Sequence, residues 1–325
     1  MSLNNLYLML LACLSLMSAP LAAAARPVSE VGFEQRKLPD GTEIGIWYPT
    51  LGTAKQQRLE LYQQTIVPNG PVQGKQRALV VMSHGSGGSF AGHLDTASEL
   101  ARAGFIVAAL THPGDNWRDR SSATDVNIRP NALGALVTYM LNDWPSHKQI
   151  DTKRVGAFGF SAGGFTVLAA AGGRPDLSRV ASHCAANPEF YDCKLVRAHR
   201  QGSAQPWIGT KDSRIKAVVV AAPALGFTFG RAELAGVKIP VQLWRAAEDK
   251  ILPAPFYADA VKAALPATPE FHDVPGAGHF DFLAPCADPK LAPQICTSSD
   301  GFDRSAFHVR FNQDIVSFFR KHLKK

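Results

Sequence analysis

From about residue 31 onward, the chain alternates short apolar runs with amphipathic segments. Uninterrupted apolar runs are typical of strands that are buried on both faces of a sheet. Segments whose apolar residues recur every three or four positions are typical of helices that pack one face against such a sheet. The pattern therefore predicts a single α/β domain in which a mainly parallel sheet is covered by helices on both faces.

The predicted strands span residues 31–38, 42–48, 77–83, 105–110, 155–160, 215–221, 241–244 and 271–274. The predicted helices span about 92–103, 130–141, 162–171, 255–264 and 308–322. Pro39-Asp40-Gly41 supplies the turn of a hairpin between the first two strands. Residues 51–76 are polar and rich in Gln, and we interpret them as an excursion from the fold. Functional residues are expected at the carboxyl ends of the parallel strands.

The start of the chain has a different composition. Residues 6–25 are uncharged and apolar and end in the small-residue run 22–25. This pattern predicts a signal peptide over residues 1–25 that is cleaved before Arg26, and a periplasmic or secreted catalytic domain over 26–325. The alternative is an uncleaved anchor, which Pro20 and the shortness of the apolar block disfavour.

Removal of that segment leaves four cysteines, Cys184, Cys193, Cys286 and Cys296, in a chain expected to enter an oxidising compartment. Four cysteines allow three pairings. Because they fall into two close pairs, we expect disulfides between Cys184 and Cys193 and between Cys286 and Cys296. The alternative is four buried thiols. The spacing fits neither a zinc ribbon nor a redox Cys-x-x-Cys motif, so no metal site is predicted.

Composition excludes several classes of protein. With 46% hydrophobic and 19% charged residues, the chain has enough apolar surface for a core, and it is not intrinsically disordered. The formal net charge of +7 favours anionic surfaces. The basic residues are scattered, apart from a cluster over residues 320–325, and no basic stripe is interleaved with aromatic residues. A role in nucleic-acid binding is therefore not expected.

The chain contains one Gly-x-Ser-x-Gly sequence, at residues 159–163. It lies between a buried strand that ends at Phe160 and a helix that begins at Ala162, which is the setting of a nucleophile elbow. The glycines allow the tight turn that raises the Ser161 hydroxyl to the edge of the sheet. The alternative is a serine that caps a helix behind a Gly-rich turn.

A serine hydroxyl needs a base to become a nucleophile near neutral pH. His279 follows the small-residue loop 275–278, directly after the last predicted strand, and is the predicted base. His272 lies inside that strand and His308 opens the final helix, so structural roles are expected for both.

The acid that orients the base is expected after the strand 241–244, where Glu248 and Asp249 offer two carboxylates. Asp249, followed by two apolar residues and Pro253, best fits a short acid turned inward, and Glu248 is the second choice. An exposed turn is the alternative interpretation. The order Ser161, Asp249, His279 differs from that of trypsin-like and subtilisin-like proteases.

The oxyanion of an acyl-transfer reaction needs preorganised hydrogen-bond donors. We predict that these are the backbone N–H of Ala162 and the N–H of Ser86, with Gly87 as its neighbour, in the Gly-rich loop 84–88. His84 is expected to organise this loop. A phosphate-cradling loop is the competing interpretation, but the Lys-Ser/Thr pair of a P-loop is absent.

With these motifs in place, nearly all of residues 28–323 resemble the α/β-hydrolase superfamily. More narrowly, they resemble the bacterial serine-dependent group named "predicted dienelactone hydrolase", which is related to platelet-activating-factor acetylhydrolases and cutinase-like polyester hydrolases. The resemblance rests on His84-Gly85-Ser86-Gly87-Gly88, Thr111-His112-Pro113-Gly114-Asp115, Arg129-Pro130, Gly159-Phe160-Ser161-Ala162-Gly163-Gly164, the Asp249 turn and Pro275-Gly276-Ala277-Gly278-His279. It implies an α/β-hydrolase fold and a serine esterase.

The resemblance does not extend to a particular substrate. Dienelactone hydrolases proper use a cysteine where this chain has Ser161. The animal acetylhydrolases carry their acid after the preceding strand, where this chain has Ala221-Ala222-Pro223. We interpret the long insertion 173–214, which holds Cys184 and Cys193, as a disulfide-pinned lid or wall, with a plain surface loop as the alternative. Trp117 and Phe160 are the candidates for a substrate pocket.

The sequence therefore predicts a hydrolase of carboxylic esters that works through an acyl-enzyme, with a small-molecule or lipid-like ester as substrate. No metal or organic cofactor, nucleic-acid partner or membrane insertion after signal cleavage is expected. An acyltransferase or a peptidase with the same triad is the first alternative. A non-enzymatic binding protein on a hydrolase scaffold is the second.

Overall fold

The protein is described by a computed structural model over residues 30–199 and 207–324. The predicted signal peptide, residues 1–25, lies outside the described residues. Within the described ranges, no helix is both long and apolar enough to cross a membrane.

One sheet runs through the described part of the chain, with the strand order β10-β9-β8-β7-β5-β6-β2-β1-β4-β3. Its strands are β1 (Glu30–Lys37), β2 (Glu43–Thr50), β3 (Lys55–Leu59), β4 (Tyr62–Pro68), β5 (Arg77–Ser83), β6 (Ile106–Leu110), β7 (Ile150–Phe160), β8 (Ile215–Ala221), β9 (Val241–Ala246) and β10 (Glu270–Val274). The six strands from β10 to β6 in this order are parallel, and the β1–β2 hairpin joins them antiparallel through β2. The predicted mainly parallel α/β fold is confirmed.

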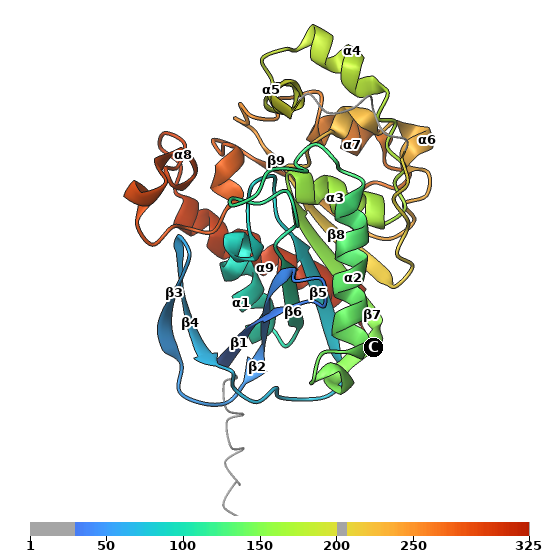
Figure 1. Cartoon of the computed structure of the whole chain (residues 1–325). Helices are drawn as coiled ribbons and strands as arrows, with labels where there is room; N and C mark the ends of the chain where they lie inside the picture. Colours follow the sequence, from blue (N-terminus) through green and yellow to red (C-terminus); the bar gives the residue numbers. More distant parts are fainter. Residues whose placement is uncertain (1–29, 200–206, 325) are drawn as a thin grey trace, which may run out of the picture.

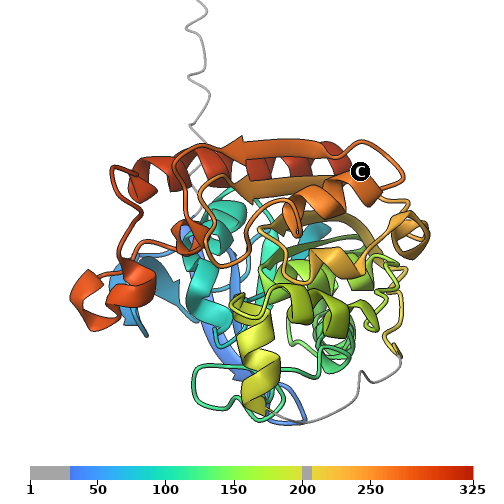
Figure 2. The ribbon, with the colours of Figure 1, turned by 90° about the horizontal axis from the view of Figure 1, so that it is seen from above.

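Helices cover both faces of this sheet (Figures 1 and 2). They are α1 (Leu94–Arg102), α2 (Ile128–Asn142), α3 (Ala162–Ala170), α4 (Arg179–Ala186), α5 (Tyr191–His199), α6 (Arg231–Leu234), α7 (Ala258–Ala264), α8 (Pro293–Cys296) and α9 (Arg304–His322). Side chains of α1 and α9 share one hydrophobic core, and those of α2, α3 and α7 share the other. Along β5, Leu79 and Val81 belong to the α2 side, whereas Val80 and Met82 belong to the α9 side. This alternation explains the unbroken apolar run of the strand.

Residues 51–76 are not merely an excursion, because they contain the β3–β4 hairpin at the sheet edge next to β1. Tyr62, Gln64 and Ile66 alternate inward along β4. The buried Gln64 accepts a 2.8 Å hydrogen bond from the indole N–H of Trp47. Because Gln64 is polar although its side chain is buried, the sequence of β4 does not show the alternation of polar and apolar residues that identifies a strand.

The start of α3 lies extremely close to β5. A Cβ added to Gly163 would lie 1.9 Å from the carbonyl oxygen of Ser83, and one added to Gly159 would lie 2.0 Å from the carbonyl oxygen of Gly163. Only glycine allows this approach of helix and strands, which sets the position of the turn between β7 and α3.

We therefore expect Gly163→Ala to lower the free energy of unfolding by at least about 2 kcal/mol, because the added methyl group overpacks a backbone contact. Gly134→Ala is the matched control, since its Cβ in α2 would have Asp212 Oδ2 as nearest atom at 3.8 Å. The control should be neutral or stabilising by up to about 1 kcal/mol. Urea denaturation measures both, and equal midpoints for the two variants would contradict the packing argument.

Candidate active site

Ser161 lies on the turn between β7 and α3 with φ +56° and ψ −118°. A non-glycine residue with positive φ carries backbone strain of about 1–3 kcal/mol, which the surroundings must offset. The N–H of Ser161 donates to the Ala221 carbonyl at 2.9 Å, and its own carbonyl accepts from the N–H of Ala224 at 2.9 Å. These two bonds, one to the last residue of β8 and one to the segment that follows it, hold the turn, which has the strand-turn-helix setting of a nucleophile elbow.

The structure brings the three predicted triad residues together. His279 Nε2 is 3.0 Å from Ser161 Oγ, and His279 Nδ1 is 2.7 Å from Asp249 Oδ2. All three side chains are buried. The other oxygen of Asp249 accepts from the backbone N–H groups of Ile251 at 2.9 Å and Leu252 at 2.8 Å. Glu248, the second choice for the acid, is exposed and makes no such contact.

The environment of Asp249 favours its ionised form. Burial raises the pKa of this carboxyl, but the charge and hydrogen bond of His279 and the amides of Leu252 and Ile251 outweigh burial. The pKa of Asp249 therefore lies below its ordinary value. A carboxylate in this position fixes the tautomer of the imidazole and stabilises an imidazolium when one forms.

Hydrogen bonds and a buried ion pair stabilise the turn that carries His279. Asp281, in the same turn, accepts from the N–H of Gly278 at 2.8 Å and forms a buried ion pair with Arg304 at 3.2 Å. Arg304 also donates to the carbonyl oxygens of Ile295 and Thr297. These carbonyls flank Cys296 of the Cys286–Cys296 disulfide, so that this crosslink and the start of α9 support the same turn.

The loop 84–88 lies opposite the elbow. Asp115 Oδ1 accepts from the Ser86 hydroxyl at 2.7 Å and from the N–H of Gly87 at 3.0 Å. The N–H of Gly87 is thus committed to Asp115, whereas Ser86 and Ala162 both line the same cavity as Ser161. This arrangement is consistent with the two amides predicted to bind an oxyanion.

A buried ion pair connects this loop to the elbow helix. Arg129 Nη1 lies 2.5 Å from Asp115 Oδ2, and each side chain is only 1% exposed. Arg129 also donates to the His84 carbonyl, and its Nε donates to Thr166 Oγ1 at 3.1 Å. Thr166 in turn donates to the carbonyl of Ala162 at 2.7 Å. The buried ion pair therefore links the residues of both predicted oxyanion donors through one network, which is partly buried at Ser86 and buried at Ala162.

Histidines complete this network. His84 Nδ1 lies 2.6 Å from the Gly85 carbonyl, and His84 Nε2 accepts from the N–H of His112 at 2.9 Å. His112 Nε2 lies 2.7 Å from the Ser83 hydroxyl. These contacts hold the loop on both sides, in keeping with the organising role predicted for His84. His308, by contrast, lies 2.6 Å from Asp95 and ties α9 to α1.

A cavity of about 660 Å³ opens over Ser161. Its walls come from the segment 121–127, the ends of β8 and β9, and the insertion after α3. The lining residues are Ser86, Ser121, Ser122, Ala123, Thr124, Asp125, Val126, Asn127, Ser161, Ala162, Leu177, Val180, Ala181, Tyr191, Asp192, Leu195, Val196, Ala224, Leu225 and Leu252. Aliphatic side chains dominate the wall formed by the insertion, and small polar side chains dominate the segment 121–127.

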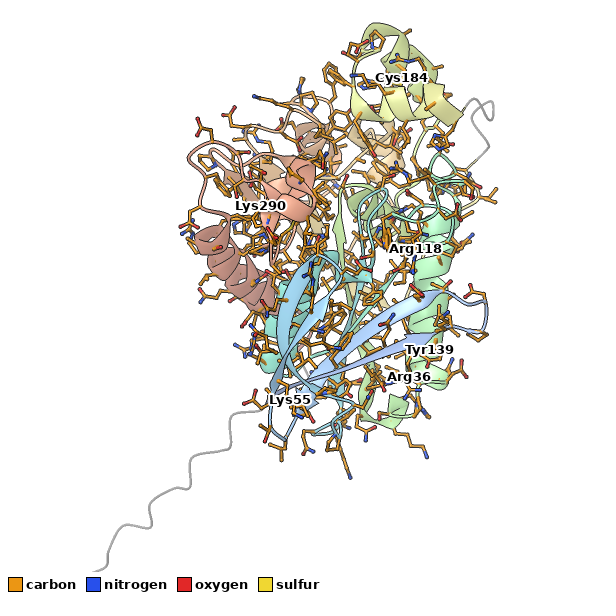
Figure 3. The ribbon with its side chains drawn as sticks, turned by 60° about the vertical axis from the view of Figure 1, so that its left-hand side comes forward. Arg36, Lys55, Arg118, Tyr139, Cys184 and Lys290 are labelled. Atoms are coloured by element: carbon orange, nitrogen blue, oxygen red, sulfur yellow. A yellow bond between two sulfur atoms is a disulfide. The ribbon has the colours of Figure 1, made fainter. Side chains whose placement is uncertain are left out.

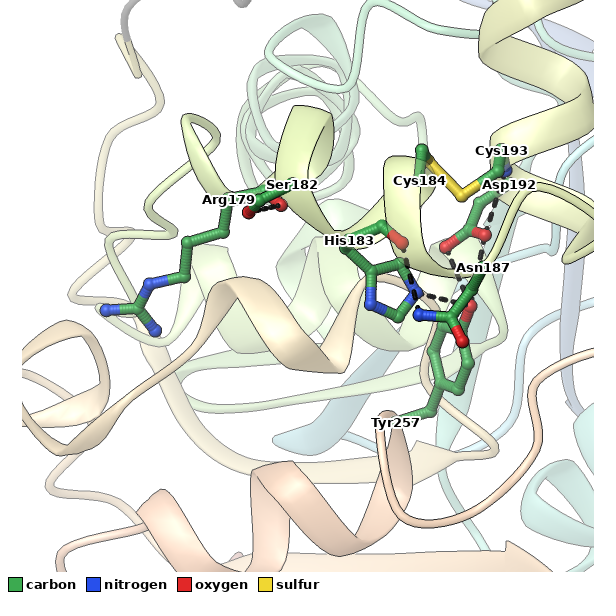
Figure 4. The surroundings of a disulfide bond; sticks show 8 residues. All are labelled: Arg179, Ser182, His183, Cys184, Asn187, Asp192, Cys193 and Tyr257. Carbon is green, nitrogen blue, oxygen red and sulfur yellow. Dashed lines mark hydrogen bonds between the residues drawn. A yellow bond between two sulfur atoms is a disulfide. The ribbon is translucent and has the colours of Figure 1, made fainter.

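The described parts of the insertion, 173–199 and 207–214, contain α4 and α5, which the Cys184–Cys193 disulfide joins (Figure 4). The pair of helices α4 and α5 contacts the rest of the protein at two points. The His183 ring stacks on Phe227 with centroids 3.6 Å apart, and the Tyr257 hydroxyl donates to the Asp192 carboxylate at 3.0 Å. The helices form the outer wall of the cavity, at the end of the molecule opposite Lys55 (Figure 3).

Comparisons with known proteins agree with this geometry. The model of the prolyl oligopeptidase family matches residues 95–193, which is less than half of the chain and includes the elbow. A candidate esterase called NocK, from Nocardia uniformis subsp. tsuyamanensis, is 26% identical over 162 residues, or 49% of this chain and 45% of that protein. The chain thus spans less than half the length of this relative. A ferulic acid esterase from Streptomyces cinnamoneus superposes with a TM-score of 0.61 at 20% identity, over 93% of this chain and 92% of the other.

The chain is an α/β-hydrolase by fold. The narrower resemblance to the "predicted dienelactone hydrolase" group stays a prediction.

The predicted pocket residues Trp117 and Phe160 do not line the cavity over Ser161. Phe160 belongs to the core on the α9 side, and its ring lies 4.8 Å from the His279 ring, behind the base. Trp117 is 58% exposed, with the Arg118 guanidinium over its ring at 5.0 Å. Both residues are near site residues in the sequence, but neither side chain lines the cavity, because the direction of a side chain depends on its position in the strand and on the path of the loop.

One cluster among the described residues has the spacing of a metal site. His183, Asp192 and Cys193 place ligand atoms within 4.8 Å of one another. The sulfur of Cys193 is bonded to Cys184, so it offers no thiolate. Burial raises the pKa of Asp192, against the opposing hydrogen bond of Tyr257 and charge of His183.

The buried ion pair gives the first prediction for the site. Asp115→Asn leaves the Arg129 charge uncompensated and should destabilise the protein by about 3–5 kcal/mol. Asp273→Asn is the control, because Asp273 pairs with Arg245 at 2.8 Å on the surface and should change stability by less than about 1 kcal/mol. Thermal and urea unfolding of both variants measure the difference. Equal losses of stability would contradict the central role given to Arg129.

The buried histidines predict how stability depends on pH. Burial lowers the pKa of His84 and of His93 to about 3, and burial together with Arg129 lowers the pKa of His112 well below its usual range. The unfolded chain binds these protons below about pH 6.5, whereas the folded protein does not. The contribution of these neutral histidines to the free energy of unfolding should therefore be fully present above about pH 6.5. It should decrease as the pH falls toward 3.

Urea midpoints between pH 7 and pH 4 measure this effect. His93→Phe removes one titrating group and should reduce the slope by up to about 1.4 kcal/mol per pH unit. Ser317→Ala, which changes an exposed residue and removes no titrating group, should leave the slope unchanged. A stability that is constant from pH 7 to pH 4 would show that the folded protein binds these protons as readily as the unfolded chain does, which contradicts the prediction.

Proposed function

We propose that this protein is a serine hydrolase that cleaves carboxylic esters through a covalent acyl-enzyme. The observation that carries the proposal is the strained Ser161 turn, with His279 Nε2 at 3.0 Å from the hydroxyl and Asp249 behind the imidazole. Nucleophile, base and orienting acid in hydrogen-bond reach of one another are the requirement of this chemistry. The names of the two esterases similar to this chain support the same reaction class.

The mechanism assigns one role to each group. His279 accepts the proton of the Ser161 hydroxyl while Ser161 attacks the ester carbonyl, and Asp249 stabilises the imidazolium. The N–H groups of Ser86 and Ala162 bind the oxyanion of the tetrahedral intermediate. His279 then donates its proton to the leaving alcohol. Water, activated by the same imidazole, releases the acid and regenerates Ser161.

The cavity supports a substrate with a bulky group on one side of the ester. A volume of about 660 Å³ lies within the range of sites for small organic ligands. Its aliphatic wall favours an apolar acyl or alcohol moiety, and the hydroxyl groups of the segment 121–127 offer hydrogen bonds to polar substituents. We propose a periplasmic or secreted location, which the predicted signal peptide and two disulfides support.

The test is hydrolysis of a chain-length series of p-nitrophenyl esters. Ser161→Ala should lower kcat/KM at least about a thousandfold with an unchanged circular dichroism spectrum, because the nucleophile is lost. Ser317→Ala, on the exposed side of α9, is the matched control and should retain full activity. Equal rates for the wild type and Ser161→Ala would exclude the proposed nucleophile.

A peptidase is the second candidate, because the prolyl oligopeptidase family model matches residues 95–193. Paired ester and p-nitroanilide substrates with the same acyl group separate the two functions. The esterase proposal predicts turnover of the ester with anilide cleavage at least about a hundredfold slower. Comparable rates on both substrates would favour the peptidase.

A further inference from the structure

A second hollow, which we call the basic hollow, lies at the other end of the parallel strands from Ser161. It has a volume of about 290 Å³ and is bounded by the start of β5, the turn between α1 and β6, Arg154 in β7 and the end of α9. From Arg77 to Ser83, β5 runs six residues toward the active site, a distance of about 20 Å. The basic hollow is therefore separate from the catalytic cavity. The C terminus lies at this end, away from α4 and α5 (Figure 1).

The lining of the basic hollow is strongly cationic. It includes Lys75, Arg77, Arg154, Arg320 and Lys324 around the apolar Ala78, Ala103, Phe105 and Leu323. None of the described residues that line it is acidic. Among residues 30–199 and 207–324, the carboxylate that pairs with a member of this set is Asp151, which lies 2.8 Å from Arg154. Like charges of this density repel one another unless an anion compensates them.

The Arg77 guanidinium is held in a fixed place. Its Nε donates to the Gln73 carbonyl at 3.2 Å, and its Nη1 donates to the Gly104 carbonyl at 3.4 Å. Gly74 and Gly104 both have positive φ, and a Cβ at either residue would lie within 3 Å of the guanidinium. The two glycines thus make room for this head group, which keeps N–H donors beyond those used by the carbonyls.

Two further arginines are oriented in the same way. Arg154 donates to the carbonyls of Leu323 and Gln76, and Arg320 donates to the carbonyl of Ala103. The side chains of Lys75 and Lys324 form no hydrogen bond or ion pair with any residue in 30–199 or 207–324. Preordered guanidinium groups and two uncommitted ammonium groups are the donor set that binds phosphate oxygens.

We infer that the basic hollow binds phosphate groups. A carboxylate carries one charge and would leave most of the five cations uncompensated, whereas a phosphate dianion or a pair of linked phosphates matches them better. The phosphate has two sources, a free diphosphate or a lipid head group. Binding to a phosphate-bearing surface through this end would leave the cavity over Ser161 facing away from it.

The test uses the full chain, with sodium pyrophosphate in isothermal titration calorimetry and vesicles in cosedimentation. Vesicles of phosphatidylglycerol are compared with vesicles of phosphatidylcholine. We expect saturable binding to at least one phosphate source, which high salt weakens because it screens the charges. Pyrophosphate binding alone identifies a soluble ligand, and selective binding to phosphatidylglycerol identifies a surface. Either result supports the inference, and binding of neither overturns it.

Variants locate the binding. The double variant Lys75→Gln/Lys324→Gln removes two charges without removing a hydrogen bond and should weaken binding about tenfold. Arg77→Gln, added to these changes, should abolish it. Arg310→Gln, on the exposed surface of α9 outside the hollow, is the matched control and should bind as the wild type does. Ester hydrolysis should be unchanged in all of these variants. Equal affinity in the wild type and the double variant would place the binding elsewhere and overturn the inference.

Discussion

The positive φ of Ser161 is the constraint on which the site depends. A serine in this conformation projects its hydroxyl from the end of β7 while its backbone bonds to the end of β8. The turn fits only because Gly159 and Gly163 let strand and helix approach within a distance that no other residue allows. The backbone strain therefore lies at Ser161, the residue whose hydroxyl has to project from the sheet. The stability of the rest of the parallel sheet offsets the free-energy cost of this strain.

A second constraint connects the pieces around that serine. The buried Arg129–Asp115 pair joins the loop 84–88 to the first turn of α3, so that both proposed oxyanion donors belong to one network. On the opposite side, Arg304, Asp281 and the Cys286–Cys296 disulfide hold the turn of His279. The geometry of the proposed active site thus depends on buried charge pairs and a crosslink rather than on the contacts among Ser161, His279 and Asp249 alone, which supports preorganisation of the site.

Much of the central fold was predictable because its signals are local. The apolar runs of β5 and β8 and the Gly-x-Ser-x-Gly turn depend on neighbours in sequence, and the small-residue loop placed His279 after a strand. Features that depend on distant partners were missed. The strand β4 was hidden because Gln64 is buried by its bond to Trp47. The helices α4 and α5 span only eight and nine residues, and their buried residues are His183, Asp192 and Cys193 rather than a stripe of aliphatic side chains. The direction of Trp117 and Phe160 depends on the tertiary structure.

The central claim is that Ser161 is an activated nucleophile, and covalent labelling tests it most directly. The protein is treated with a fluorophosphonate, which reacts with serines that a neighbouring base activates, and the adduct is located by peptide mass spectrometry. The account predicts one adduct per chain on Ser161, and none in His279→Ala, because the base is required. Failure of the wild type to react, or an adduct on a different side chain, would contradict it.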